Sequence, residues 1–117
     1  MPVLFHLKTF GNFALTEAAT GTRLPIPAGK AQALLTYLAL NQEPATREWL
    51  ADFLWPELPA DAGRFNLRHT FFHLRRVCGD ALFHQNRQQI GIARGRLTVD
   101  ALRLSAMTRP DMNTAIG

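Results

Sequence analysis

The feature that most constrains the fold is an apolar stripe of helical spacing between Asp61 and Gly79. Its members recur every three or four residues, which places them on one face of a helix: Leu67, Phe71, Leu74 and Cys78. Aspartate is a favourable residue at the amino-terminal cap of a helix, and glycine readily adopts the left-handed conformation that ends one. The sequence therefore predicts an amphipathic helix over 62–78, capped by Asp61 and stopped by Gly79.

Two shorter helices are predicted upstream. The first covers about 30–41, because four apolar residues share one face of it: Ala31, Leu34, Leu35 and Leu38. The second follows Thr46, a good amino-terminal cap, and stops at Pro56, which cannot continue a helix. We expect its buried face to consist of Leu50, Phe53 and Leu54.

Strand signals lie on both sides of the helices. Apolar runs around Gly11-Asn12 within 3–15 predict two antiparallel strands, and the prolines of 23–27 predict a third strand at the sheet edge. After the long helix, 81–84 and 89–93 flank the polar turn 85–88 and predict a β-hairpin, to which 97–99 adds a strand.

This order of elements predicts an α+β domain of the winged helix-turn-helix type. It has an N-terminal antiparallel β-sheet, three helices and a C-terminal β-hairpin wing. We expect the DNA-binding domain to span 1–104. The remainder, 105–117, has no periodicity and is expected to be a flexible tail or the start of a missing downstream domain.

Charge is distributed unevenly along the 117 residues, although the formal net charge is only +4. Residues 1–61 hold four Lys/Arg against six Asp/Glu, whereas 62–99 hold seven arginines against one acid, Asp80. Positive charge confined to one third of the chain predicts a surface for a polyanion, although a solvated face has the same composition. The single cysteine, Cys78, excludes an internal disulfide, and no signal peptide or membrane-spanning segment is indicated, so we expect a cytoplasmic location and no membrane partner.

The polar side of the long helix carries the candidate DNA-binding residues. Opposite the apolar stripe lie hydrogen-bonding side chains suited to base edges in a major groove, Asn66, His69, His73 and Arg76, with Thr70 on the flank of this face. At the border of the stripe lie arginines whose heads can reach phosphates: Arg64, Arg68 and Arg75. In the hairpin turn, Arg87 and Gln88 suit a wing that enters the adjacent minor groove.

The sequence leaves three points open. The border arginines, Arg68 above all, can pair instead with Glu48 or Asp52 on the second helix. Phe65 and Phe72 project toward the polar side, where they either pack under the second helix or contact thymine methyl groups. A polar hairpin tip is also ordinary in any soluble protein.

Three segments resemble the DNA-binding domain of bacterial transcriptional activators, the family that includes the antibiotic regulatory (SARP-type) proteins. Residues 62–79, AGRFNLRHTFFHLRRVCG, resemble the recognition helix, 50–56, LADFLWP, the second helix, and 29–40 the first. The similarity extends over about 3–104, with Val99-Asp100 where the DNA-binding part ends. It implies an OmpR/PhoB-like winged-helix fold and a role in activating transcription. The helical-repeat domain that follows in the family is absent, and Ile90-Gly91-Ile92 replaces the usual Gly-Tyr pair of the wing.

Other functional classes find little support in the sequence. His69 and His73 lack a third ligand at metal-binding spacing, and no glycine-rich phosphate loop is present, so neither a metal nor another cofactor is predicted. Cys78 lies on the apolar stripe and suits the core better than catalysis, so we do not expect an enzyme. RNA binding lacks paired exposed aromatics on strands. The main alternative is a protein-interaction winged helix that contacts the transcription machinery, with 56–60 as the loop that docks on RNA polymerase. The operator, the oligomeric state on DNA and the choice between activator and repressor stay open.

Overall fold

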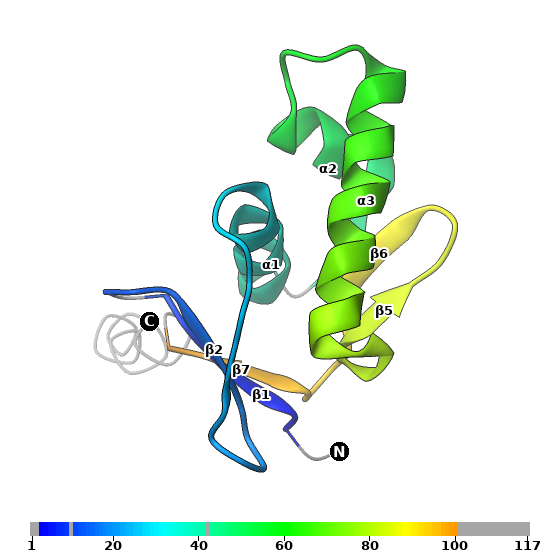
Figure 1. Ribbon diagram of the computed structural model, residues 1–117. Coiled ribbons are helices and arrows are strands. Elements are labelled where there is room, and N and C mark those ends of the chain that lie inside the picture. The colour runs from blue at the N-terminus through cyan, green and yellow to red at the C-terminus, as the bar shows by residue number, and fades with distance from the viewer. Residues whose placement is uncertain (1–2, 10, 42, 101–117) are drawn as a thin grey trace, which may run out of the picture.

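The computed structural model describes residues 3–9, 11–41 and 43–100, which form an α+β fold. Its described helices are α1 (Lys30–Leu40), α2 (Arg47–Leu54), α3 (Ala60–Cys78) and a 3-10 turn at Asp80–Leu82. The strands form two small sheets (Figure 1). The predicted tail, 105–117, lies outside the described residues.

The first sheet has the strand order β3-β2-β1-β7. As predicted, β1 (Phe5–Lys8) pairs antiparallel with β2 (Ala14–Glu17), and β3 (Arg23–Leu24) forms the edge, although it is shorter than expected. The expectation that 97–99 extends the hairpin is wrong. This segment forms β7 (Leu97–Val99), which pairs parallel with β1, because the chain crosses back to the first sheet after the hairpin and buries Val99 there.

The second sheet has the order β4-β6-β5. Strands β5 (Phe83–Gln85) and β6 (Gln89–Ile92) form the antiparallel hairpin that the sequence predicts. Strand β4 (Ala45–Thr46), which the sequence analysis does not anticipate, pairs with β6 immediately before α2 begins. The hairpin is therefore fastened to the amino-terminal end of α2.

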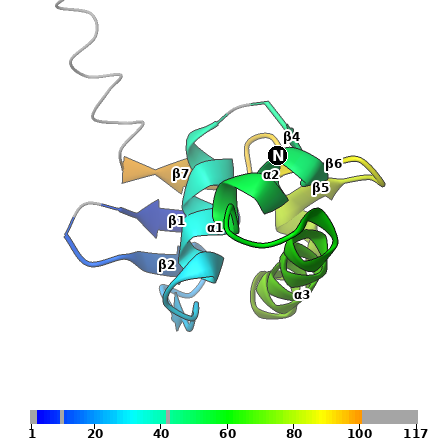
Figure 2. The same cartoon turned by 90° about the horizontal axis from the view of Figure 1, so that it is seen from above.

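Helix α1 lies between the two sheets and contributes to both halves of one core (Figure 2). All four residues predicted for its inner face are buried, and so are all four members of the α3 stripe. Phe71 is 1% exposed and meets Phe83 of the hairpin edge-to-face, with ring centroids 5.1 Å apart. Burial of this stripe thus joins α3 to both α1 and the hairpin.

The ends of the helices follow the prediction only in part. The Thr46 hydroxyl accepts a hydrogen bond from the Trp49 amide, as expected of a cap, and Gly79 after α3 has a positive φ of 88°. Asp61 is not the cap of α3. The helix begins two residues earlier than predicted, at Ala60 after an extended Pro59, and the Pro59 carbonyl accepts from the Gly63 amide. Asp61 instead lies in the first turn, where a carboxylate favours the helix dipole.

The predicted inner face of α2 also needs a correction. Leu50 and Leu54 are buried as expected, but Phe53 is 50% exposed, and Ala51 takes its place in the core. Ala51 packs against Gly63 of α3, and this close approach of α2 to α3 turns Phe53 outward toward α1. None of the described helices is long and apolar enough to cross a membrane.

Candidate nucleic-acid interface

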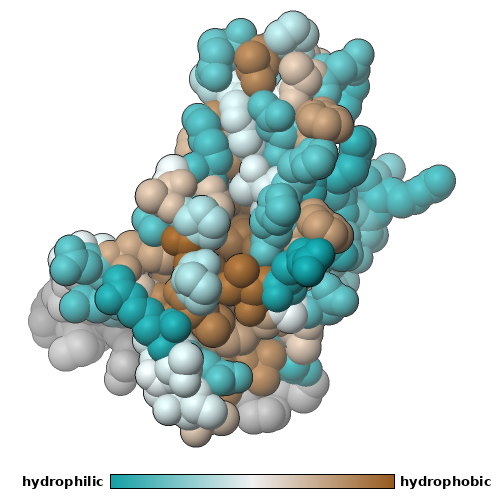
Figure 3. All heavy atoms as spheres, in the orientation of Figure 1, coloured by the Kyte–Doolittle hydropathy of each residue, from teal (hydrophilic) through white to brown (hydrophobic). Residues whose placement is uncertain are grey.

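Helix α3 has two flanks beside its buried stripe and an outer surface between them. Counting about 100° per residue from Leu67, one flank carries Arg64, Arg68 and Arg75, and the opposite flank carries Asn66 and Thr70. The outer surface between the flanks carries His69 and Arg76. Hydrophilic side chains cover much of this side of the molecule and the tip of the hairpin (Figure 3).

The hairpin is held against α2 by Arg47, the first residue of that helix. Its amide donates to the Gln88 carbonyl at 2.8 Å, and its guanidinium donates to the Asn86 carbonyl at 3.0 Å and to Oε1 of Gln85 at 2.6 Å. Within the turn, Oδ1 of Asn86 accepts from the amides of Gln88 and Gln89, both at 2.8 Å. The tip that carries Arg87 therefore has a defined position beside α2 and α3.

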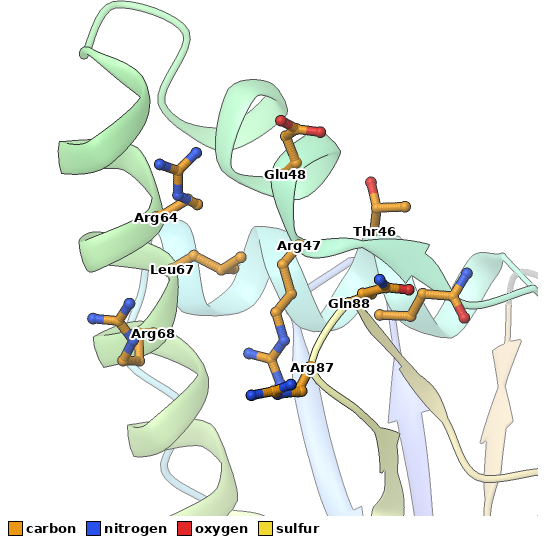
Figure 4. A pocket seen from close by; sticks show the side chains of 9 residues that line it. Thr46, Arg47, Glu48, Arg64, Leu67, Arg68, Arg87 and Gln88 are labelled. Atoms are coloured by element: carbon orange, nitrogen blue, oxygen red, sulfur yellow. The ribbon is translucent and has the colours of Figure 1, made fainter.

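A hollow of about 470 Å³ separates α3 from the hairpin tip. Figure 4 shows Arg64, Leu67 and Arg68 of α3 on one side of it, with Arg47, Arg87 and Gln88 on the other. Four arginines and one glutamate, Glu48, line the hollow, a formal balance of +3. Of these arginines, Arg64 forms an ion pair with Asp61 at 2.6 Å.

The other arginines of the hollow lack an acidic partner in the described part of the chain. Neither Arg68 nor Arg87 forms an ion pair there, so the expected alternative pairing of Arg68 with Glu48 or Asp52 is absent. Burial lowers the pKa of Arg47 from its ordinary value, and the charges of Arg75 and then Arg68 lower it further. These arginines repel one another because the acids of the described residues do not neutralise them. An anion from outside can relieve this repulsion.

Arg75 is the least available of the predicted arginines. Its side chain is 29% exposed, its guanidinium lies 4.9 Å from the centroid of the Phe71 ring, and it approaches Asp80 at 3.9 Å. Its buried Nε has no hydrogen-bond partner among the described residues. Arg75 therefore contributes charge to the cluster while its stem packs on the core.

The outer surface of α3 combines histidines, phenylalanines and an exposed arginine. Phe65, which is 53% exposed, lies against His69 with ring centroids 4.4 Å apart, and Phe72 approaches His73 at 5.6 Å. The Arg76 guanidinium lies 5.6 Å from the Phe72 ring. A shallow hollow on this surface joins four predicted residues to Phe72: Arg68, His69, His73 and Arg75.

The predicted base-reading residues do not form one group. His69, His73 and Arg76 are exposed, whereas Asn66 and Thr70 are half-buried on the flank that faces away from the arginine hollow. The structure thus brings Arg64, Arg68, Arg87 and Gln88 together and leaves Asn66 and Thr70 apart from them.

Sequence reasoning missed Arg47. It precedes the basic segment 62–99 and lies within a stretch whose net charge is negative. Its place in the hollow depends on the pairing of β4 with β6, which joins residues more than forty positions apart. The only local signal for Arg47 is its position directly after the Thr46 cap, as the first residue of α2.

The histidines of α3 and the buried cysteine are the remaining candidates for metal binding or nucleophilic chemistry. The rings of His69 and His73 have centroids 6.5 Å apart, and the described residues contain no cluster of three or more candidate metal ligands. Burial raises the pKa of the Cys78 thiol to about 11, so the reactive thiolate is scarce near neutral pH. No protein-family model matches the chain, and a search of curated proteins finds none with significant similarity.

Proposed function

We propose that this chain binds double-stranded DNA and regulates transcription, with α3 as the recognition helix and the β5–β6 hairpin as a wing. The observation that carries the proposal is the hollow between α3 and the hairpin, where Arg47, Arg68 and Arg87 lack acidic partners within the described residues. A phosphate group supplies the missing negative charge and accepts the hydrogen bonds that guanidinium groups donate.

The dimensions of α3 suit this role. Its 19 residues extend over roughly 28 Å, and the major groove of B-DNA, about 12 Å wide, admits one α-helix. With the outer surface of α3 in the groove, His69, His73 and Arg76 face base edges. Arg68 and Arg87, at the two sides of the hollow, then hold the backbone strand that passes between the helix and the wing.

The half-buried residues take a secondary part in the proposal. Asn66 and Thr70 are assigned to the distal border of the base-reading surface, and Arg64 and Arg75 support the phosphate contacts through charge. Phe65 and Phe72, both exposed on the same surface, are placed to contact thymine methyl groups, the second of the two interpretations that the sequence leaves open.

The proposed class is a winged helix-turn-helix of the OmpR/PhoB type in a cytoplasmic activator similar to the SARP-type proteins. The order of α1, α2, α3 and hairpin supports this assignment, as does the resemblance of 62–79 to a recognition helix. In this assignment the loop over 56–60 faces the transcription machinery.

Selection of bound duplexes from a random oligonucleotide pool tests the proposal. We expect one preferred site to emerge, and a footprint on it that covers one major groove and the neighbouring minor groove. His73→Ala should cost roughly 1–3 kcal/mol on that site and much less on random DNA, and Asn66→Ala, at the border of the base-reading surface, should cost less than His73→Ala. Arg75→Ala should weaken both kinds of DNA in similar proportion.

A matched control is His6→Ala, an exposed histidine on β1 that lies outside both α3 and the hairpin. It should leave both affinities unchanged. If selection enriches no sequence, or if His6→Ala weakens binding as much as His73→Ala does, α3 does not read DNA.

A further inference from the structure

A cluster of three aromatic rings lies on the surface formed by α1 and α2. Trp49 and Phe53 stack with centroids 4.8 Å apart, and Tyr37 of α1 meets them at 5.0 and 5.3 Å. Trp49 is 45% and Phe53 50% exposed, although each ring already has two aromatic neighbours. The rings are thus held in fixed positions while a large part of their apolar area faces water.

The apolar surface continues beyond the three rings. Leu40 of α1 is exposed, and a shallow hollow on that side is lined by Phe13, Tyr37, Leu40 and Phe53. A second hollow, between Tyr37 and Trp49, is lined in part by Pro44 and Ala45. Scattered apolar residues are ordinary on a protein surface, but a contiguous patch of large side chains marks an interaction site. We call the group of Tyr37, Leu40, Trp49 and Phe53 the aromatic surface.

The aromatic surface and the arginine hollow lie on different faces of α2, although Thr46 lines both the arginine hollow and the hollow beside Trp49. On α2, Phe53 is about 160° around the helix axis from Ala51, the residue that contacts Gly63 of α3. A molecule bound on the aromatic surface therefore leaves the outer surface of α3 free. The inference is independent of the proposed DNA binding, because none of its residues belongs to that site.

Negative charge surrounds the aromatic surface. Glu43 lines the hollow beside Tyr37 and Trp49, and Asp52 is a surface neighbour of Trp49 three residues along α2. Neither carboxylate has an ion-pair partner within the described residues. One cation, Lys30, donates to the Leu54 carbonyl at the end of α2 and keeps its charge.

These charges select one class of occupant. A symmetric contact with a second copy would bring the acids of both copies to the same interface, and an anionic membrane or nucleic acid would be repelled by them. An amphipathic helix presents apolar anchors at spacings of three, four and seven residues, and cationic residues beside those anchors match Glu43 and Asp52. We propose that the aromatic surface binds a basic amphipathic helix of a partner protein.

A display library of helical peptides with unbiased charge tests this proposal without knowledge of the natural partner. Peptides are selected on the whole chain and then depleted on the Trp49→Ser/Phe53→Ser double variant, so that only binders of the aromatic surface remain. We expect the surviving peptides to share an apolar stripe flanked by lysine and arginine. Their affinity should fall at least about tenfold on Phe53→Ser alone, as for a truncated aromatic anchor.

Two further variants separate docking from loss of folding. Asp52→Lys and Glu43→Lys leave the three rings in place, and each should weaken the same peptides several-fold. Phe65→Ser removes an equally exposed aromatic side chain from α3 and should not affect them. All variants are compared by circular dichroism before binding is measured.

Three results overturn the proposal. The first is a selection in which depletion leaves no binders, and the second is a surviving pool without an excess of positive charge. The third is a dimer in sedimentation equilibrium that dissociates on Phe53→Ser, because the occupant would then be a second copy of the chain.

Discussion

Replacing Arg47 by methionine should destabilise the protein, and the loss should grow as the salt concentration rises. Arg47 donates two side-chain hydrogen bonds to the hairpin, at 2.6 and 3.0 Å. At a partly exposed position each bond contributes about 0.5–1.5 kcal/mol, so their removal costs on the order of 2 kcal/mol. Methionine keeps most of the apolar stem and removes the charge and the donors.

Repulsion from the neighbouring arginines opposes that loss. The guanidinium carbons of Arg47 and Arg75 lie 5.7 and 4.9 Å from the centroid of the same Phe71 ring, so their separation cannot exceed about 11 Å. At roughly 10 Å two unit charges repel by about 0.4 kcal/mol in water and about 1.7 kcal/mol at an effective dielectric constant of 20. At low salt, the removal of this repulsion therefore offsets a large part of the stability that the variant loses with its two hydrogen bonds. At high salt, screening has already weakened the repulsion, so the offset is small.

Urea unfolding of both proteins at about 10 mM and about 300 mM salt measures the effect. We expect the free energy of unfolding to fall by about 1 kcal/mol in Arg47→Met at the lower concentration and by nearly 2 kcal/mol at the higher. Arg23→Met is the matched control, because Arg23 also donates to a carbonyl, that of Phe13, but lies on the edge strand outside the cluster. A loss that shrinks with salt, or one that grows equally in the control, would refute the repulsive cluster.

Further predictions concern the core and the thiol. Phe71→Ala should lower the free energy of unfolding by about 3–5 kcal/mol in a thermal or urea melt, because the side chain is 1% exposed and joins α3 to the hairpin. A melt that overlays that of the parent would mean that α3 does not pack as described. Because burial raises the pKa of the folded-state Cys78 thiol to about 11, above its ordinary value of 9.0, the unfolded state loses its proton first as pH rises. The contribution of Cys78 to the free energy of unfolding should therefore be complete below pH 9 and fall by on the order of 2 kcal/mol as pH rises toward 11. Urea unfolding of Cys78→Ala should lack this fall. The same fall in the variant would contradict its attribution to Cys78.

The parts of the fold that depend on local periodicity could be predicted from the sequence. The stripe from Leu67 to Cys78 and the inner face of α1 are buried as expected, because a helical repeat of apolar residues has one arrangement that removes them from water. The hairpin was predictable for a similar reason, since two short runs flank a turn that Asn86 stabilises through its own side chain.

The errors share a different cause, which is the choice of partner at long range. Strand β7 pairs with β1 rather than with the adjacent hairpin, and strand β4 is held by β6. Phe53 follows the helical spacing of Leu50, but the contact between Ala51 and Gly63 decides which way α2 turns. Asp61 is a residue type that favours the cap position, yet Pro59 occupies that position and the helix begins two residues earlier than predicted.

The candidate site, like the fold, could be predicted from the sequence only in its local features. The basic residues of α3 and the wing could be named because they are concentrated in one segment. Their grouping could not, because Arg47 joins them only through the β4–β6 pairing, and because the flank that faces the hairpin depends on how α3 packs.

The salt dependence of binding to duplex DNA tests the central claim most directly. Fluorescence anisotropy of a labelled duplex gives the dissociation constant at several salt concentrations. We predict a steep log–log slope that corresponds to about 4–7 phosphate contacts at roughly 0.9 each. The Arg68→Gln/Arg87→Gln double variant should lower that slope by about two units, whereas Arg23→Gln, away from the hollow, should leave it unchanged. A flat salt response, or a double variant with the slope of the parent, would contradict the account.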